Sequence, residues 1–120
     1  MPLANLEDRE REVVRECLRA AVEGPFFPDW EFETLFGLGR EEVRCVLLSW
    51  STLDEANETV VLAINNSMVN LIGYPLGEDQ DAWPAFISVN RTELASVFDK
   101  WKGRPPRSSH SARDYFDNMM

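Results

Sequence analysis

Few residues in this chain could do chemistry, and their positions argue against an enzyme. The one histidine, His110, lies in a Pro-, Arg- and Ser-rich stretch whose composition is typical of a flexible tail. A general base or a metal ligand needs a fixed position, which such a tail does not give. Neither a GxxxxGK[ST] phosphate loop nor a GxGxxG motif is present. We therefore expect a chain without catalytic activity, cofactor or bound metal.

Asparagines cluster in a segment whose apolar residues otherwise recur at helical spacing. Asn65, Asn66 and Asn70 fall within six residues, although Asn is a poor helix former. One interpretation is structural: Asn65 satisfies a backbone group of a neighbouring element, and the small side chains allow close packing. The other is a polar recognition patch, in which Asn66 and Asn70 contact a partner.

An acidic loop flanked by aromatic residues follows the asparagines. Acidic side chains attract a basic partner over a distance, and exposed aromatic rings can anchor it after docking. The alternative is that Trp83 fills the core and the acidic residues only keep the loop solvated. The predicted partner-binding residues are Asn66, Asn70, Tyr74, Glu78, Asp79, Asp81 and Trp83.

Charge and composition bound the class of protein. With 120 residues, 44% of them apolar, the chain can bury one core. Its net charge is −9, and residues 104–120 hold three Arg and two Asp, so residues 1–103 carry −10. Such a body repels nucleic acid and anionic lipid and attracts basic proteins, although the charge could also serve solubility alone.

Two further features of the sequence concern its cellular location. The first ten residues are charged where a signal peptide would be apolar, and no run approaches the roughly 18 apolar residues of a membrane span. Cys17 and Cys45 form no CxxC motif, so we expect both to be reduced thiols in the core. These features predict a cytoplasmic protein that binds neither membrane nor nucleic acid.

Apolar periodicity predicts the elements that position these residues. The expected helices span residues 6–23, 29–37, 40–50, 52–73 and 90–103. The fourth, opened by a capping-box pattern at Thr52–Glu55, is apolar over most of its circumference and should be central. Residues 85–89 could be extended. The prediction is a mainly α-helical, irregular bundle of about five helices in a single domain, 1–103, followed by a flexible linker and tail, 104–120.

Aromatic residues divide into two groups by their surroundings. Those at helical spacing are expected in the core, and those in loops beside proline are candidate binding anchors. The first group comprises Trp30, Phe32, Phe36, Trp50, Phe98 and Trp101. The second group comprises Phe26, Phe27, Tyr74 and Trp83.

Together these patterns favour a small acidic, non-enzymatic protein-binding module. In this hypothesis it resembles a bacterial immunity or inhibitor protein in presenting an acidic and aromatic surface to a basic protein partner. One alternative is a helix-turn-helix regulator or adaptor built from residues 29–50, although Glu41 and Glu42 would face the phosphates. The other alternative is a structural or self-associating module. The partner's identity and the oligomeric state stay open.

Overall fold

Six α-helices and three short 3-10 helices build the part of the chain that the computed structural model describes, residues 2–74 and 77–103. This part contains no strand, which confirms the mainly α-helical prediction. The α-helices are α1 (Asp8–Glu23), α2 (Asp29–Phe36), α3 (Arg40–Leu48), α4 (Glu58–Gly73), α5 (Trp83–Phe86) and α6 (Arg91–Lys102). The 3-10 helices are η1 (Pro2–Asn5), η2 (Trp50–Thr52) and η3 (Gly77–Ala82). The predicted tail, 104–120, lies outside the described residues.

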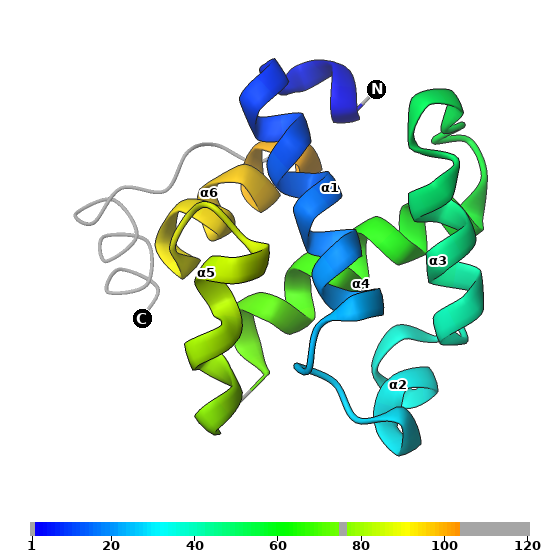
Figure 1. Cartoon of the computed structure of the whole chain (residues 1–120). Coiled ribbons are helices and arrows are strands. Elements are labelled where there is room, and N and C mark those ends of the chain that lie inside the picture. The colour runs from blue at the N-terminus through cyan, green and yellow to red at the C-terminus, as the bar shows by residue number, and fades with distance from the viewer. Residues whose placement is uncertain (1, 75–76, 104–120) are drawn as a thin grey trace, which may run out of the picture.

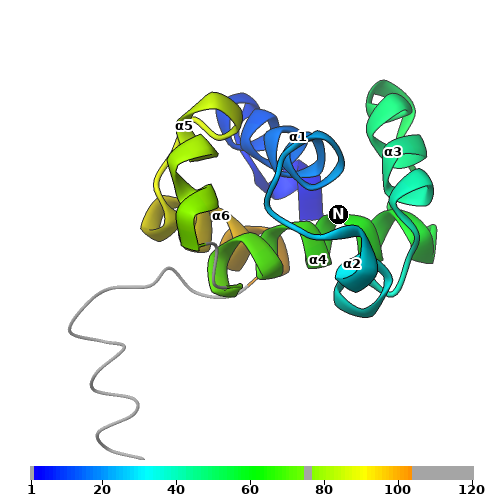
Figure 2. The same ribbon diagram turned by 60° about the horizontal axis from the view of Figure 1, so that its bottom comes forward.

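Helix α4 lies at the centre of the bundle, as its apolar circumference predicts. It packs against α1, α2, α3 and α6, and α1 crosses over it (Figure 1). When the molecule is turned, α1, α3 and α5 stand on one side of α4 (Figure 2). Ile64, Met68 and Leu71 of α4 are completely buried. This inner face of α4 forms one side of the hydrophobic core.

Two helices begin later than the sequence suggests. Asn5 belongs to η1, and α1 begins only at Asp8, where the backbone N–H of Glu7 donates to Glu10. The Thr52–Glu55 pattern caps no helix, because Asn57 caps α4 instead by accepting from the Thr59 backbone. Glu55 instead joins distant segments of the chain, since its carboxylate accepts from the Leu3 backbone and from the Trp101 indole.

The expectation of an extended segment at residues 85–89 is wrong for its first half. Helix α5 continues to Phe86, and Pro84 suits its first turn because the ring fixes φ at a helical value. Ile87 has extended backbone angles, but no described strand lies beside it to complete a sheet. Ile87 and Val89 are buried among the helices instead.

Three aromatic residues lie elsewhere than predicted. Trp30 is 79% exposed, because Phe32 and Phe36 stack together on the buried face of α2 and leave Trp30 on the opposite face. Phe26 and Phe27, predicted as candidate binding anchors, are almost fully buried and belong to the core instead.

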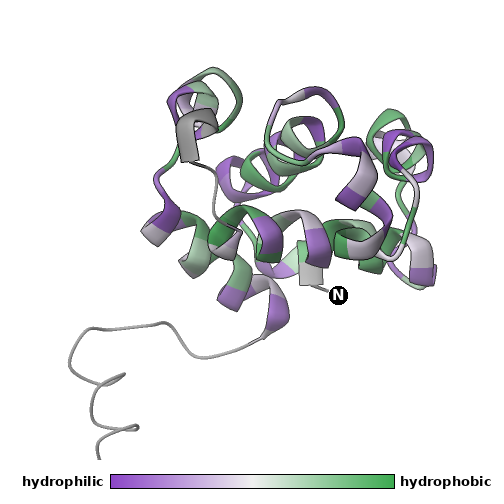
Figure 3. Ribbon diagram, turned by 90° about the horizontal axis from the view of Figure 1, so that it is seen from below, coloured by the Kyte–Doolittle hydropathy of each residue, from purple (hydrophilic) through white to green (hydrophobic). Residues whose placement is uncertain are grey.

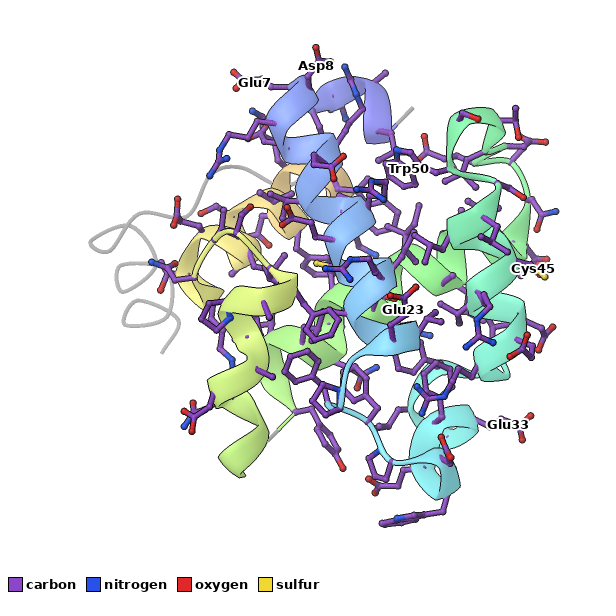
Figure 4. All side chains as sticks on the ribbon, in the orientation of Figure 1. Glu7, Asp8, Glu23, Glu33, Cys45 and Trp50 are labelled. Atoms are coloured by element: carbon purple, nitrogen blue, oxygen red, sulfur yellow. The ribbon has the colours of Figure 1, made fainter. Side chains whose placement is uncertain are left out.

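The cysteines also differ from expectation. Cys17 is buried as predicted, but Cys45 is exposed on the outer side of α3, and Figure 4 shows its side chain at the margin of the molecule. The two thiols are free.

An ion pair joins the first and last helices. Lys100 Nζ lies 2.8 Å from Glu10 Oε1, which also accepts from the Glu7 backbone. Burial alone would raise the pKa of Glu10, but the Glu7 and Lys100 contacts outweigh it and hold that pKa below its ordinary value. The Glu10 carboxylate therefore stabilises the fold above its unfolded-state pKa, and this contribution is lost as the pH falls through the lowered value.

We expect Glu10→Gln to unfold at lower urea concentration than the wild type at neutral pH. The difference should shrink on acidification, since the wild-type carboxyl then becomes neutral as well. Urea unfolding from pH 7 to pH 3 measures it. Glu12→Gln, which removes an exposed pair with Arg15 on the same helix, should lose less stability. An unchanged Glu10→Gln midpoint at neutral pH would contradict this account.

Candidate functional site

The outer face of α2 combines an exposed tryptophan with acidic residues. We call Asp29, Trp30, Glu33 and Thr34 the Trp30 face; all four residues are exposed. Trp30 has the largest exposed fraction of any large apolar side chain in the described residues. Glu33 extends away from the bundle (Figure 4). An aromatic ring on the surface beside carboxylates can anchor a partner and attract positive charge.

Two asparagines of α4 hold the C-terminal end of α2. Asn66 Nδ2 donates to Phe36 O at 2.7 Å, and Asn70 Nδ2 donates to Leu35 O at 3.0 Å. The last carbonyls of a helix have no partner within it, so these amides satisfy groups that would otherwise need water. The stability lost through asparagine in a helix is thereby offset by a tertiary contact. The structural interpretation therefore holds for Asn66 and Asn70 but not for Asn65, whose amide donates to Asn66 Oδ1 and not to a backbone group of a neighbouring element.

The same flank of α4 continues to Tyr74, one turn beyond Asn70. Its hydroxyl donates to Glu31, and its ring meets Phe27 edge-on with centroids 5.5 Å apart. The hydrogen bond to Glu31 raises the pKa of Tyr74, because it favours the protonated phenol. Residues 66, 70 and 74 thus form a row along α4 that contacts α2 from its C-terminal to its N-terminal half.

Arg40 fastens the N-terminal end of α2. Its guanidinium donates to Asp29 Oδ1 at 2.7 Å, to Phe27 O at 2.9 Å and to Ala21 O, at the end of α1, at 3.0 Å. It also lies 4.4 Å from the centre of the Phe32 ring. One cation therefore joins α1, the following loop and α2. Arg40 at one end and the two asparagines at the other hold α2, and with it the Trp30 face.

Trp83 is joined to that row indirectly, through Arg91, whose guanidinium donates to Tyr74 O at 3.3 Å and lies over the Trp83 ring. The indole Nε1 donates to Val89 O at 2.7 Å, and the ring packs edge-on against Phe26. Arg91 covers the ring from 5.6 Å and borders, with Gln80, an open hollow of about 500 Å³. Trp83 is half-buried. These contacts give its ring a packing role.

The acidic residues of the predicted loop are described only in part. Asp81 is exposed. The side chains of Glu78 and Asp79 lie outside the described residues, so their place in a binding surface stays a prediction. Of the seven predicted residues, Asn66, Asn70 and Tyr74 are brought together, and all three support α2 by hydrogen bonds.

Neither Trp30 nor Arg40 was identified as a site residue from the sequence. A signal for Trp30 was present, because two phenylalanines four residues apart, Phe32 and Phe36, define the buried side of so short a helix. Trp30, two positions before Phe32, must then face outward. No local sequence signal shows that the Arg40 side chain turns inward, because its acceptors lie at the end of α1 and in the loop that follows.

Residues 2–74 and 77–103 contain no group of three or more His, Cys, Asp or Glu that could hold a metal ion. Burial raises the pKa of the Cys17 thiol, which suppresses the reactive thiolate. Cys45 is exposed and borders an open hollow of about 380 Å³ together with Glu42 and Asp54.

Comparisons with known protein families, with curated proteins and with solved structures give no match. Within the described part of the chain, no helix is long and apolar enough to cross a membrane.

The two tryptophans allow a paired test of this geometry. Trp83→Ala should lower the free energy of unfolding by roughly 2–4 kcal/mol, because it opens a cavity beside Phe26 and leaves Val89 O unpaired. Trp30→Ala should change it by less than about 0.5 kcal/mol, since the ring is exposed. Urea unfolding followed by circular dichroism compares them. Equal losses would show that Trp30 packs into the bundle.

Proposed function

We propose that this chain is a small non-enzymatic protein-binding module that presents the Trp30 face to a basic protein, as an immunity or inhibitor protein does. The observation that carries the proposal is the 79% exposure of Trp30 on a helix held at both ends. Exposing a large aromatic ring gains no folding stability. A rigid ring loses little conformational entropy on binding and is a common anchor in protein interfaces.

Charge supports a basic partner. Between Gly24 and Gly39 the chain has three acidic residues and no lysine or arginine, and between Cys45 and Asn90 it has six acidic residues and again none. The intervening Arg40 and Arg44 are paired with Asp29 and Glu41. Such a surface speeds encounter with a positively charged protein and is weakened by salt.

The same geometry supports the expectation that DNA is not the partner. α2, the Gly37 turn and α3 have the layout of a helix-turn-helix. In this layout the first cation of the second helix, Arg40, turns inward to backbone carbonyls. Glu41 and Glu42 are exposed at the position where a recognition helix would approach phosphates. We retain the protein-binding proposal over the regulator alternative for this reason.

The test begins with affinity capture from an extract of the source organism, followed by binding kinetics with the captured protein in purified form. We expect Trp30→Ala to raise the dissociation rate at least tenfold, and Glu33→Gln to lower the association rate and its salt dependence. Leu48→Ala is the matched control, since Leu48 is 78% exposed on α3, away from the Trp30 face.

Two results would contradict the proposal. One is a captured partner that binds the Trp30→Ala variant as tightly as the wild type. The other is recovery of the chain itself as the only partner, which would favour the self-associating alternative.

A further inference from the structure

The side of α4 that faces away from α1 is apolar and uncovered. Val61, Leu62 and Val69 are 37%, 38% and 40% exposed, although α4 is the central helix and packs against four others. We call these three residues the α4 face. Figure 3 views the molecule from below, so α4 runs across the picture and the side of α4 that faces away from α1 is directed toward its lower edge. No described element covers the α4 face, so it offers apolar contact area to a partner.

The α4 face adjoins the Trp30 face. Leu62 Cδ2 lies 3.5 Å from the position of a Cβ built on Gly37, the residue that ends α2. Gly37 has a φ of 69°, in the left-handed region that glycine favours. Because it has no side chain, no group projects between the Trp30 face and the α4 face at this point. One continuous surface therefore extends from Trp30 on α2 over Gly37 to Leu62 and Val69 on α4.

The two borders of the α4 face carry opposite charge. On the α2 side lies Glu33, whose carboxylate comes within 3.5 Å of a Cβ built on Gly39, in the turn after α2. On the α6 side, Asn65 lies between Val61 and Val69, one turn from each, and Lys102 reaches it, with Nζ 3.4 Å from Asn65 Oδ1 and 5.9 Å from the centre of the Trp101 ring. A ligand lying along α4 thus meets an acidic border on one side and a basic border on the other.

We propose that the α4 face is the docking site for one amphipathic helix of the partner, with its apolar stripe on Val61, Leu62 and Val69 and its arginines or lysines toward α2 and Trp30. This inference rests on the proposed function and adds the kind of partner segment. Leu62 and Val69 are seven residues, about 10 Å, apart along the helix axis. A partner helix with apolar residues at i and i+7 has the same spacing.

The charge borders select a basic helix over an acidic one. An acidic amphipathic helix in the same place would set its carboxylates against Glu33, in a chain that has no lysine or arginine between Cys45 and Asn90. Lys102 would give an acidic helix a favourable charge contact along only one edge of the α4 face. The apolar stripe then sets the register of the partner helix along α4, and the acidic residues of the Trp30 face determine which edge of that helix faces α2.

The probe is a fluorescein-labelled, 18-residue amphipathic peptide of leucine, alanine and lysine. Its binding to the full chain is measured by fluorescence anisotropy at physiological salt. Two control peptides accompany it, one with the same composition in scrambled order and one with glutamate in place of lysine. We expect the amphipathic basic peptide to bind at least tenfold more tightly than either control. Equal binding of the scrambled peptide would overturn the inference, since charge alone would then explain the affinity.

Two variants locate the peptide. Val69→Lys should weaken its binding at least tenfold, whereas Leu48→Lys, which adds the same charge at an exposed apolar residue outside the surface, should change it less than threefold. Both positions are exposed, and thermal melts verify that both variants fold. Equal weakening by the two variants, or none by Val69→Lys, would overturn the inference.

The natural partner separates this inference from the proposed function. If Trp30→Ala weakens that partner and Val69→Lys does not, the Trp30 face stands and docking on α4 is excluded. If neither substitution weakens it, both proposals fall. Loss of affinity in both variants, with Leu48→Lys unchanged, supports both.

Discussion

Two side-chain amides on the central helix determine where α2 lies. Asn66 and Asn70 donate to the carbonyls of Phe36 and Leu35, which α2 cannot satisfy itself because they belong to its last turn. An eight-residue helix is too short to be stable alone, so its position depends on such tertiary contacts. Arg40 completes the attachment at the opposite end. The exposed Trp30 owes its fixed position to these contacts.

This arrangement explains why a polar cluster occurs in the central helix of the bundle. The inner face of α4 builds the core through Ile64, Met68 and Leu71. One flank binds α2 by hydrogen bonds, and the side away from α1 is apolar but uncovered. Each face of α4 thus has a separate task, namely core packing, attachment of α2 and, in our proposal, contact with a partner.

The sequence predicts the mainly α-helical fold, the central helix and the ends of α6, because these depend on local periodicity and capping. Asn90 caps α6 through the Glu93 backbone, and Gly103 ends it in the left-handed conformation, as expected. The Thr52–Glu55 pattern gave a wrong start for the central helix, because Glu55 accepts hydrogen bonds from the distant Leu3 and Trp101 and caps no helix. The spacing of Phe32 and Phe36 indicates the buried face of α2, but the prediction placed every aromatic residue at helical spacing in the core, and Trp30 was therefore assigned wrongly. The partners of Asn66, Asn70 and Arg40 depend on how helices meet, which one sequence does not display.

Amide hydrogen exchange in a variant with Asn66→Ala and Asn70→Ala together tests the central claim most directly. Both amides that hold the last turn of α2 are then absent, while the core face of α4 is intact. The account predicts that the amides of α2 lose most of their protection, whereas those of α1 and α6 keep theirs. Unchanged protection of α2 would contradict it, because α2 would then be held by its phenylalanines alone.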